Sequence, residues 1–170
     1  MAVLTICTYP DPVLRRKTEC VKIIDKGVQR LIDDMVNTMY DAPGVGLAAN
    51  QVGRSLSLIV VDIQREECEY GLIVLINPEL VSARGEMTFE EGCLSVPDYF
   101  ASVTRHEEIV VSGLDRDGKQ IQITASGLLA IALQHEMDHL EGKLFIDRIS
   151  PIARDIFKRR WKKKIKEERQ

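Results

Sequence analysis

The sequence has little of what marks several common classes of protein. No apolar run approaches the ~20 residues of a membrane-spanning helix. The opening segment, MAVLTICTYP, has neither a basic region nor a long apolar region, so we expect no secretory signal and a cytoplasmic location. The four cysteines form no CxxC pair, so neither a disulfide framework nor a cysteine-only zinc site is expected.

Length and composition favour one compact domain, residues 1–170, without repeats or a low-complexity linker. The net charge of −3 is unevenly placed: residues 151–170 hold nine Lys or Arg against three Asp or Glu, a local +6 that leaves −9 for the rest. We expect a basic C-terminal helix at 150–168 that meets an anionic partner. The alternative is a solvated helix that packs through its apolar residues.

Hydrophobic periodicity predicts an α+β fold. Helical spacing and end signals predict three helices: 25–41 with Asp25 as its cap, a second from Ser126 as its cap to Gly142, and a third from Ser150-Pro151. Apolar and β-branched runs predict the strands: 56–63, 72–76, 103–114 and, after a turn at 115–118, 119–124. We therefore expect antiparallel sheets packed around a central helix, with a further helix near each end.

The expected contact stripe of the last helix is apolar: Ile152, Ile156, Phe157, Trp161 and Ile165.

The sharpest chemical pattern is His135-Glu136-Met137-Asp138-His139. Two of only three histidines lie about one helical turn apart, where both imidazoles can bind one metal ion. Glu136 can then take a proton from water at that metal. The alternative is a helix with two surface histidines. The apolar surroundings predict a buried helix instead, in which unpaired imidazoles would be costly.

A third ligand is needed for a hydrolytic site that keeps one position open. Downstream, Glu141 and Asp147 follow no spacing typical of zinc proteases. Upstream lies Glu91-Gly92-Cys93-Leu94-Ser95, in which a thiolate next to glycine can approach a metal closely. Two histidines and a cysteine suit zinc or ferrous iron.

A third segment, Gly44-Val-Gly-Leu-Ala-Ala-Asn-Gln51, has small residues that let a peptide approach its backbone. Its last residue, Gln51, offers an amide donor to a developing oxyanion.

Together the three segments, in this order and spacing, resemble the signature motifs of the peptide deformylases. The helical end resembles the compact bacterial subtype. The resemblance implies a metal-dependent hydrolase that removes the formyl group from the N-terminal formyl-methionine of new polypeptides and releases formate. It implies ferrous iron as the native ion, with zinc, nickel or cobalt able to replace it.

The resemblance also implies a role for each matching residue. The implied metal ligands are Cys93, His135 and His139. The implied catalytic groups are Glu136 as general base and then acid, with Gln51 and the backbone N–H of Leu94 at the oxyanion. The implied peptide-binding residues are Val45, Gly46 and Gly92 through their backbone, and Leu128, Ile131 and Ala132 around the methionine side chain. Glu91 paired with Arg105 would support the site.

The partners implied are formylated nascent peptides and, through the basic helix, the ribosome; a monomer suffices and no membrane is involved. Two rivals make different predictions. A zinc endopeptidase of the HExxH type needs a third ligand downstream. A ribosome- or RNA-binding module with a structural metal needs a fourth protein ligand, such as His106 or another cysteine.

Overall fold

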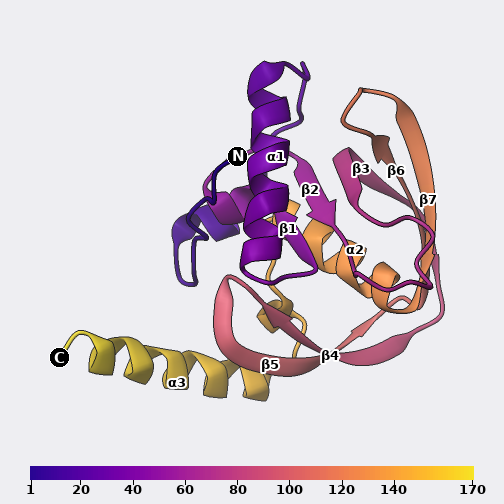
Figure 1. Ribbon diagram of the computed structural model, residues 1–170. Coiled ribbons are helices and arrows are strands. Elements are labelled where there is room, and N and C mark those ends of the chain that lie inside the picture. Colours follow the sequence, from indigo (N-terminus) through magenta and orange to yellow (C-terminus); the bar gives the residue numbers. More distant parts are fainter.

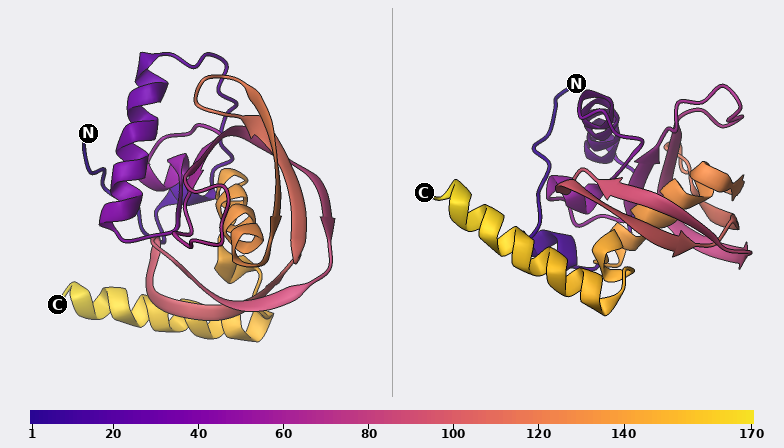
Figure 2. Two further views of the ribbon diagram at one scale, coloured as in Figure 1. Left: turned by 45° about the vertical axis from the view of Figure 1, so that its right-hand side comes forward. Right: turned by 90° about the horizontal axis from the view of Figure 1, so that it is seen from below.

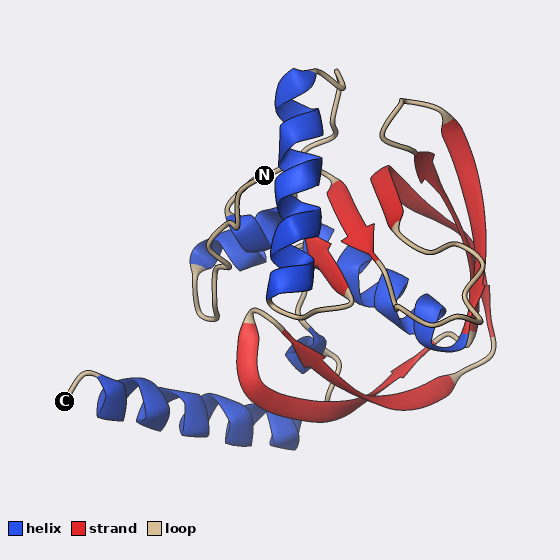
Figure 3. Cartoon of the chain, in the orientation of Figure 1, coloured by secondary structure: helices blue, strands red, loops and turns tan.

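A computed structural model describes residues 1–170 as an α+β fold (Figure 1). The helices are α1 (Lys26–Asp41), α2 (Gly127–Leu140) and α3 (Pro151–Glu168), with short 3₁₀ turns η1 (Pro12–Arg15), η2 (Ala49–Val52) and η3 (Phe145–Asp147). The strands, drawn in red in Figure 3, follow α1 and precede α2 in the sequence: β1 (Gly46–Ala48), β2 (Leu58–Val61), β3 (Ile73–Arg84), β4 (Met87–Cys93), β5 (Val96–Arg105), β6 (Glu108–Leu114) and β7 (Gln120–Ser126). The predicted fold class is confirmed.

The strands form two antiparallel sheets, one of five strands in the order β1-β2-β3-β6-β7 and one of two, β4-β5. The prediction of a single strand over 103–114 is wrong. The chain changes sheets at His106-Glu107, because β5 pairs with β4 as far as Arg105, whereas β6 pairs with β3 and β7. The predicted turn at 115–118 is confirmed, since Asp115 donates its N–H to the carbonyl of Lys119 at 2.9 Å.

Strand β4 and the first half of β5 were not predicted. Glu90, Glu91 and Gly92 are poor strand formers by propensity, so the segment carries no strand signal of its own. Tertiary pairing overrides that weak propensity, and the last residue of β4 is Cys93.

Helix α1 begins and ends where the sequence predicted. The Asp25 carboxylate accepts the N–H of Val28 at 2.9 Å, which caps the first turn. On its apolar face, Ile32, Met35 and Met39 are fully buried against β1 and β2, and Leu31 is partly buried.

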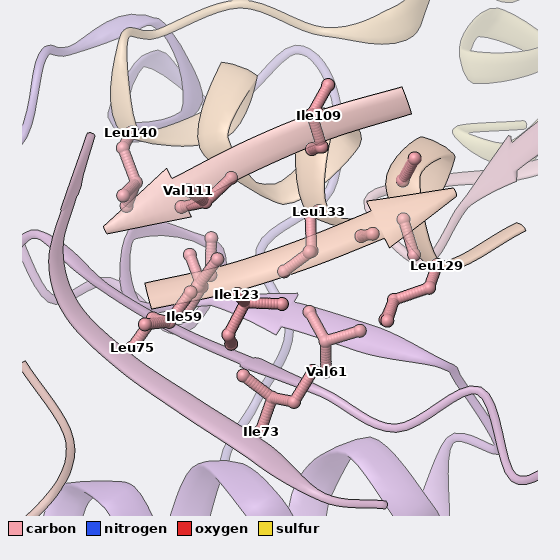
Figure 4. Packing of buried hydrophobic residues seen from close by; sticks show 14 residues of the cluster. Ile59, Val61, Ile73, Leu75, Ile109, Val111, Ile123, Leu129, Leu133 and Leu140 are labelled. Atoms are coloured by element: carbon pink, nitrogen blue, oxygen red, sulfur yellow. The ribbon is translucent and has the colours of Figure 1, made fainter. Parts of the chain in front are cut away.

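Helix α2 lies between the five-stranded sheet and the β4–β5 pair (Figures 1 and 2). Leu129, Leu133 and Leu140 pack into a cluster with the inward side chains of the sheet, as Figure 4 shows. Ser126 stands at the N-terminal cap position, but its side chain makes no capping hydrogen bond, contrary to prediction. Gly142 follows the helix at φ +74°, as expected of a residue that ends it. Burial on several sides fixes the two histidines of α2 in place.

Helix α3 starts as predicted, with the Ser150 hydroxyl accepting the N–H of Ala153 at 3.2 Å. Its predicted apolar stripe is only half right. Phe157 and Trp161 are buried, but Ile152 and Ile156 are 75% and 44% exposed. The helix contacts the body through the aromatic rings of Phe157 and Trp161, and Ile152 and Ile156 lie outside this contact. Its C-terminal end extends away from the body (Figure 2). None of the α-helices combines the length and apolar character that a membrane crossing requires.

Candidate metal centre and active site

Three potential metal ligands, one from β4 and two from α2, lie close together. Cys93 comes from the end of β4, while His135 and His139 lie one turn apart on α2. The Cys93 Sγ is 3.3 Å from His139 Nε2, which is 3.3 Å from His135 Nε2, and all three ligand atoms lie within 4.8 Å of one another.

This donor set fits a metal ion. Two nitrogens, each ~2.0 Å from one ion at a tetrahedral angle, are separated by about 3.3 Å, as the two Nε2 atoms are here. A mixed set of thiolate and imidazole suits zinc or ferrous iron. Burial lowers the pKa of His139 well below its usual range, so its ring is neutral, the form that a metal ligand needs.

Glu91 determines which nitrogen of His135 faces the other ligands. Its Oε1 accepts from His135 Nδ1 at 2.9 Å, and its carboxylate also accepts from Arg105 Nε and Nη2 at 2.6 and 2.9 Å. Burial alone raises the pKa of Glu91, but the hydrogen bonds from His135 and Arg105 outweigh it and keep that pKa below its ordinary value. The ionised carboxylate can only accept, so one ring proton stays on Nδ1 and Nε2 is the nitrogen that faces the cluster. Burial lowers the pKa of His135, but hydrogen bonds with Cys93 and Glu91 outweigh it and hold that pKa well above its usual range, so a metal at Nε2 would displace a proton.

Glu136 is buried next to these ligands, and its Oε2 has no hydrogen-bond partner within the protein. Burial raises the pKa of its carboxyl to about 7. A carboxyl with this pKa can both accept and return a proton near neutral pH. Gly46 on β1 makes the approach possible, because a Cβ at this position would lie 2.6 Å from Glu136 Oε1.

The amide of Gln51 is held in one orientation. Its Oε1 accepts the N–H of Ala48 at 2.9 Å, which turns its Nε2 toward the Ser95 hydroxyl at 3.0 Å and toward Cys93 Sγ at 3.6 Å. The amide donor therefore points to the candidate ligands, where an oxyanion could form.

A cavity of about 700 Å³ opens onto Cys93, His135 and Glu136. Every predicted peptide-binding residue lines it: Val45, Gly46, Gly92, Leu128, Ile131 and Ala132. Gln51 and Leu94 line it as well. His139 lies deeper, 1% exposed, and Arg105 lies behind Glu91.

Several residues at this site were not singled out from the sequence. Ser95 is fully buried against Gln51, and Asn50 Nδ2 donates to the carbonyl of His139 at 2.5 Å. Asp138 accepts from Arg105 Nη1 at 2.9 Å, and the Phe145 ring stacks on His135 with centroids 6.0 Å apart. Ser95, Asn50 and Asp138 lie inside or beside the motifs, so their neighbourhood was a usable signal. Nothing in the sequence connects Phe145 to the site.

The geometry disagrees with both rival readings. Asp147 accepts from Arg15 Nη1 at 2.5 Å and from Leu144 N at 2.9 Å, and Glu141 pairs with Lys17, so the downstream carboxylates are engaged elsewhere. His106 is exposed and lies outside the group of Cys93, His135 and His139, as do the other cysteines. A Cys–His–His group beside a buried carboxylate, open to a peptide-sized cavity, defines a metal-dependent hydrolase.

Comparison with known proteins gives this hydrolase its family. The family model described as polypeptide deformylase matches residues 3–155. A peptide deformylase of Syntrophobacter fumaroxidans is 69% identical over 98% of each chain, and one of Thermodesulfovibrio yellowstonii is 53% identical over 96% of this chain and 99% of its own. The crystal structure of a peptide deformylase from Legionella pneumophila covers 99% of each chain at a TM-score of 0.90 and 48% identity.

The chain belongs to the polypeptide deformylase family. It is a metal-dependent hydrolase that removes the formyl group from the N-terminal formyl-methionine of newly synthesised polypeptides. The family predicted from the three motifs is confirmed.

Proposed function

We propose that Cys93, His135 and His139 hold the catalytic metal ion and that Glu136 moves the protons of the deformylation. The convergence of the three ligand atoms within 4.8 Å of one another supports this assignment most strongly. When bound, the metal supplies Lewis acidity that activates water and polarises the formyl carbonyl.

Glu136 accepts the proton of the attacking water through its carboxylate and then returns it to the nitrogen of the leaving methionine. Its pKa of about 7 and its burial beside His135 support both steps. Gln51 Nε2 and the backbone N–H of Leu94 donate to the oxyanion that develops on the formyl oxygen, and the fixed amide of Gln51 supports its part. Glu91, held by Arg105, orients His135.

The substrate lies in the 700 Å³ cavity with its backbone against Val45, Gly46 and Gly92. Leu128, Ile131 and Ala132, on one face of α2, surround the methionine side chain. Their apolar character and their place in the cavity wall support this assignment.

The test of these roles is Glu136→Ala. The ligands are untouched, so the variant should bind one metal per chain, while the deformylation rate falls by about 10²- to 10⁴-fold. Formate release and metal content are measured on the same sample. Full activity in that variant would contradict the assignment.

We further propose ferrous iron as the native metal, with Zn²⁺, Ni²⁺ or Co²⁺ able to replace it. The Cys–His–His donor set and the family support iron and do not require it. Protein purified without oxygen should contain iron, as metal analysis would show. Zinc alone, with full activity, would contradict this proposal.

The basic helix at 150–168 is proposed to contact ribosomal RNA, which brings the enzyme to its nascent substrates in the cytoplasm. The charge of +6 over residues 151–170 supports contact with phosphate groups here. We also propose a monomer of one domain, residues 1–170, because the cavity and the three candidate ligands form a complete site without a second chain. Truncation after Trp161 should weaken ribosome binding at low salt, and unchanged affinity would contradict this role.

A further inference from the structure

We infer that Asp138 and Arg148 are positioning residues for the metal site, acting on His135 through Arg105 and Glu91. The inference rests on the proposed role of His135 as a metal ligand. It concerns a chain of ion pairs in which Arg148, Asp138 and Arg105 lie outside the walls of the substrate cavity.

The chain of contacts is continuous from the protein surface to His135. Arg148 donates from Nε and Nη2 to both oxygens of Asp138, at 2.5 and 2.7 Å. Asp138 Oδ2 also accepts from Arg105 Nη1 at 2.9 Å. The other two donors of Arg105 bind Glu91, whose Oε1 holds the Nδ1 proton of His135.

Burial increases along this chain. The side chain of Arg148 is 40% exposed, that of Asp138 13%, and that of Arg105 2%. A buried guanidinium is stable only when its donors are paired. Arg105 therefore has one low-energy orientation, in which it spans the carboxylates of Asp138 and Glu91.

Arg148 completes this arrangement by charge and by geometry. Without it, two carboxylates would share the single guanidinium of Arg105. Asp138 would then be held by one hydrogen bond and could compete with Glu91 for the donors of Arg105. Two-point contact by Arg148 fixes Asp138, and the four charged groups sum to zero.

The chain spans four separate segments: the turn after η3, helix α2, the end of β5, and β4. It fastens the helix that bears His135 to the sheet that bears Cys93. Arg105, Asp138 and Arg148 line a second cavity of about 660 Å³, whose walls exclude Gly46, Cys93 and Glu136. Changes at Arg148 can thus alter the metal site without touching the peptide.

The experiment measures metal release from the Ni²⁺-loaded enzyme into a chromogenic chelator. Three variants are compared with the wild type: Arg148→Gln, Asp138→Asn and the double substitution. Loss of positioning should speed release in both single variants, by about tenfold, because partners behind metal ligands typically change affinity by 10- to 100-fold. The double variant should release metal faster than the wild type by a factor no larger than the product of the two factors measured for the single variants.

A pure charge effect gives a different pattern. Arg148→Gln makes the site more negative and would slow release, whereas Asp138→Asn makes it more positive and would speed release. The charge-neutral double variant would then resemble the wild type. That pattern, or release unchanged in all three variants, would overturn the inference.

Three controls separate the possible causes. Arg148→Lys keeps the charge without the two-point contact and should release metal faster than the wild type but slower than Arg148→Gln. Arg116→Gln breaks an ion pair with Asp33 on α1, away from the site, and should leave release unchanged. Cys93→Ala should fail to retain Ni²⁺. Tight retention there would overturn the proposed ligand set, whereas normal release in the network variants alone would overturn only the network.

Discussion

Replacing Gly46 with alanine would place a methyl group against the side chain of Glu136. The added Cβ would lie 2.6 Å from Oε1, 2.8 Å from Cγ and 2.9 Å from Cδ. Ordinary contact begins at 3.4 Å, so the carboxyl must move by about 0.8 Å. Glu136 is buried with 5% exposure, and Gly46 is held in register with Val61, so neither side yields easily.

A displacement on the order of 1 Å from the reactive geometry costs about 10²-fold in rate. This corresponds to about 2.7 kcal/mol in the activation free energy. Gly46→Ala should therefore lower kcat/KM for formyl-Met-Ala-Ser by about 10²-fold, with the metal retained, because Gly46 is not one of the candidate ligands.

The assay compares formate release and metal content in Gly46→Ala and in Gly27→Ala, a control in the exposed first turn of α1. The control should keep wild-type activity. Activity of Gly46→Ala within threefold of the wild type would refute the claim that Glu136 must stand against β1. Loss of metal together with activity would refute the claim that this contact acts on Glu136 alone.

Three further outcomes are expected. Gln51→Leu should lower kcat by about 10²- to 10³-fold, since one oxyanion donor is removed; a change confined to KM would contradict that role. The value of kcat/KM should fall as pH decreases through the pKa of Glu136, because only its carboxylate accepts a proton. Burial raises this pKa to about 7 and a bound cation lowers it, so a flat profile from about pH 5 to pH 8 would oppose Glu136 as the base. A metal at about a thousandfold above its Kd stabilises the folded protein by ~4 kcal/mol. Removing it with a chelator should therefore lower the Tm measured by calorimetry by about 10 °C, and an unchanged Tm would oppose a metal site built into the fold.

Helix boundaries could be predicted where the signals are local. Asp25 and Ser150 cap helices a few residues away in the sequence, and Gly142 directly follows the helix that it ends. A short stretch of sequence is therefore enough to predict these helix ends. The two sheets could not be separated in this way. The sheets are divided at His106 because β5 pairs with β4, whereas β6 pairs with β3. A local pattern of residues does not show which strand is the pairing partner.

The candidate site follows the same division. The pair His135 and His139 is visible because helical geometry converts a spacing of four into proximity. Cys93 was predicted as a ligand from the motif around it. Its distance of 3.3 Å from His139 Nε2 is set by the tertiary fold and could not be predicted from the sequence. The contacts of Asn50 with the carbonyl of His139, and of Arg148 with Asp138, depend on tertiary packing that neither spacing nor periodicity encodes.

The exposed Ile152 and Ile156 show the limit of periodicity. The stripe on α3 is present, but periodicity does not say how wide a surface the rest of the molecule offers to it. Tyr9 contacts Phe157 and Trp161, and Tyr99 contacts Phe157, whereas Ile152 and Ile156 lie outside this contact.

The most direct test of the central claim is formate release from formyl-Met-Ala-Ser by metal-loaded protein prepared without oxygen, with Cys93→Ala measured beside it. The account predicts one metal per wild-type chain and formate without cleavage of internal peptide bonds. It predicts neither metal nor formate for Cys93→Ala. Formate release by a metal-free Cys93→Ala variant at the wild-type rate would contradict the assignment of the site.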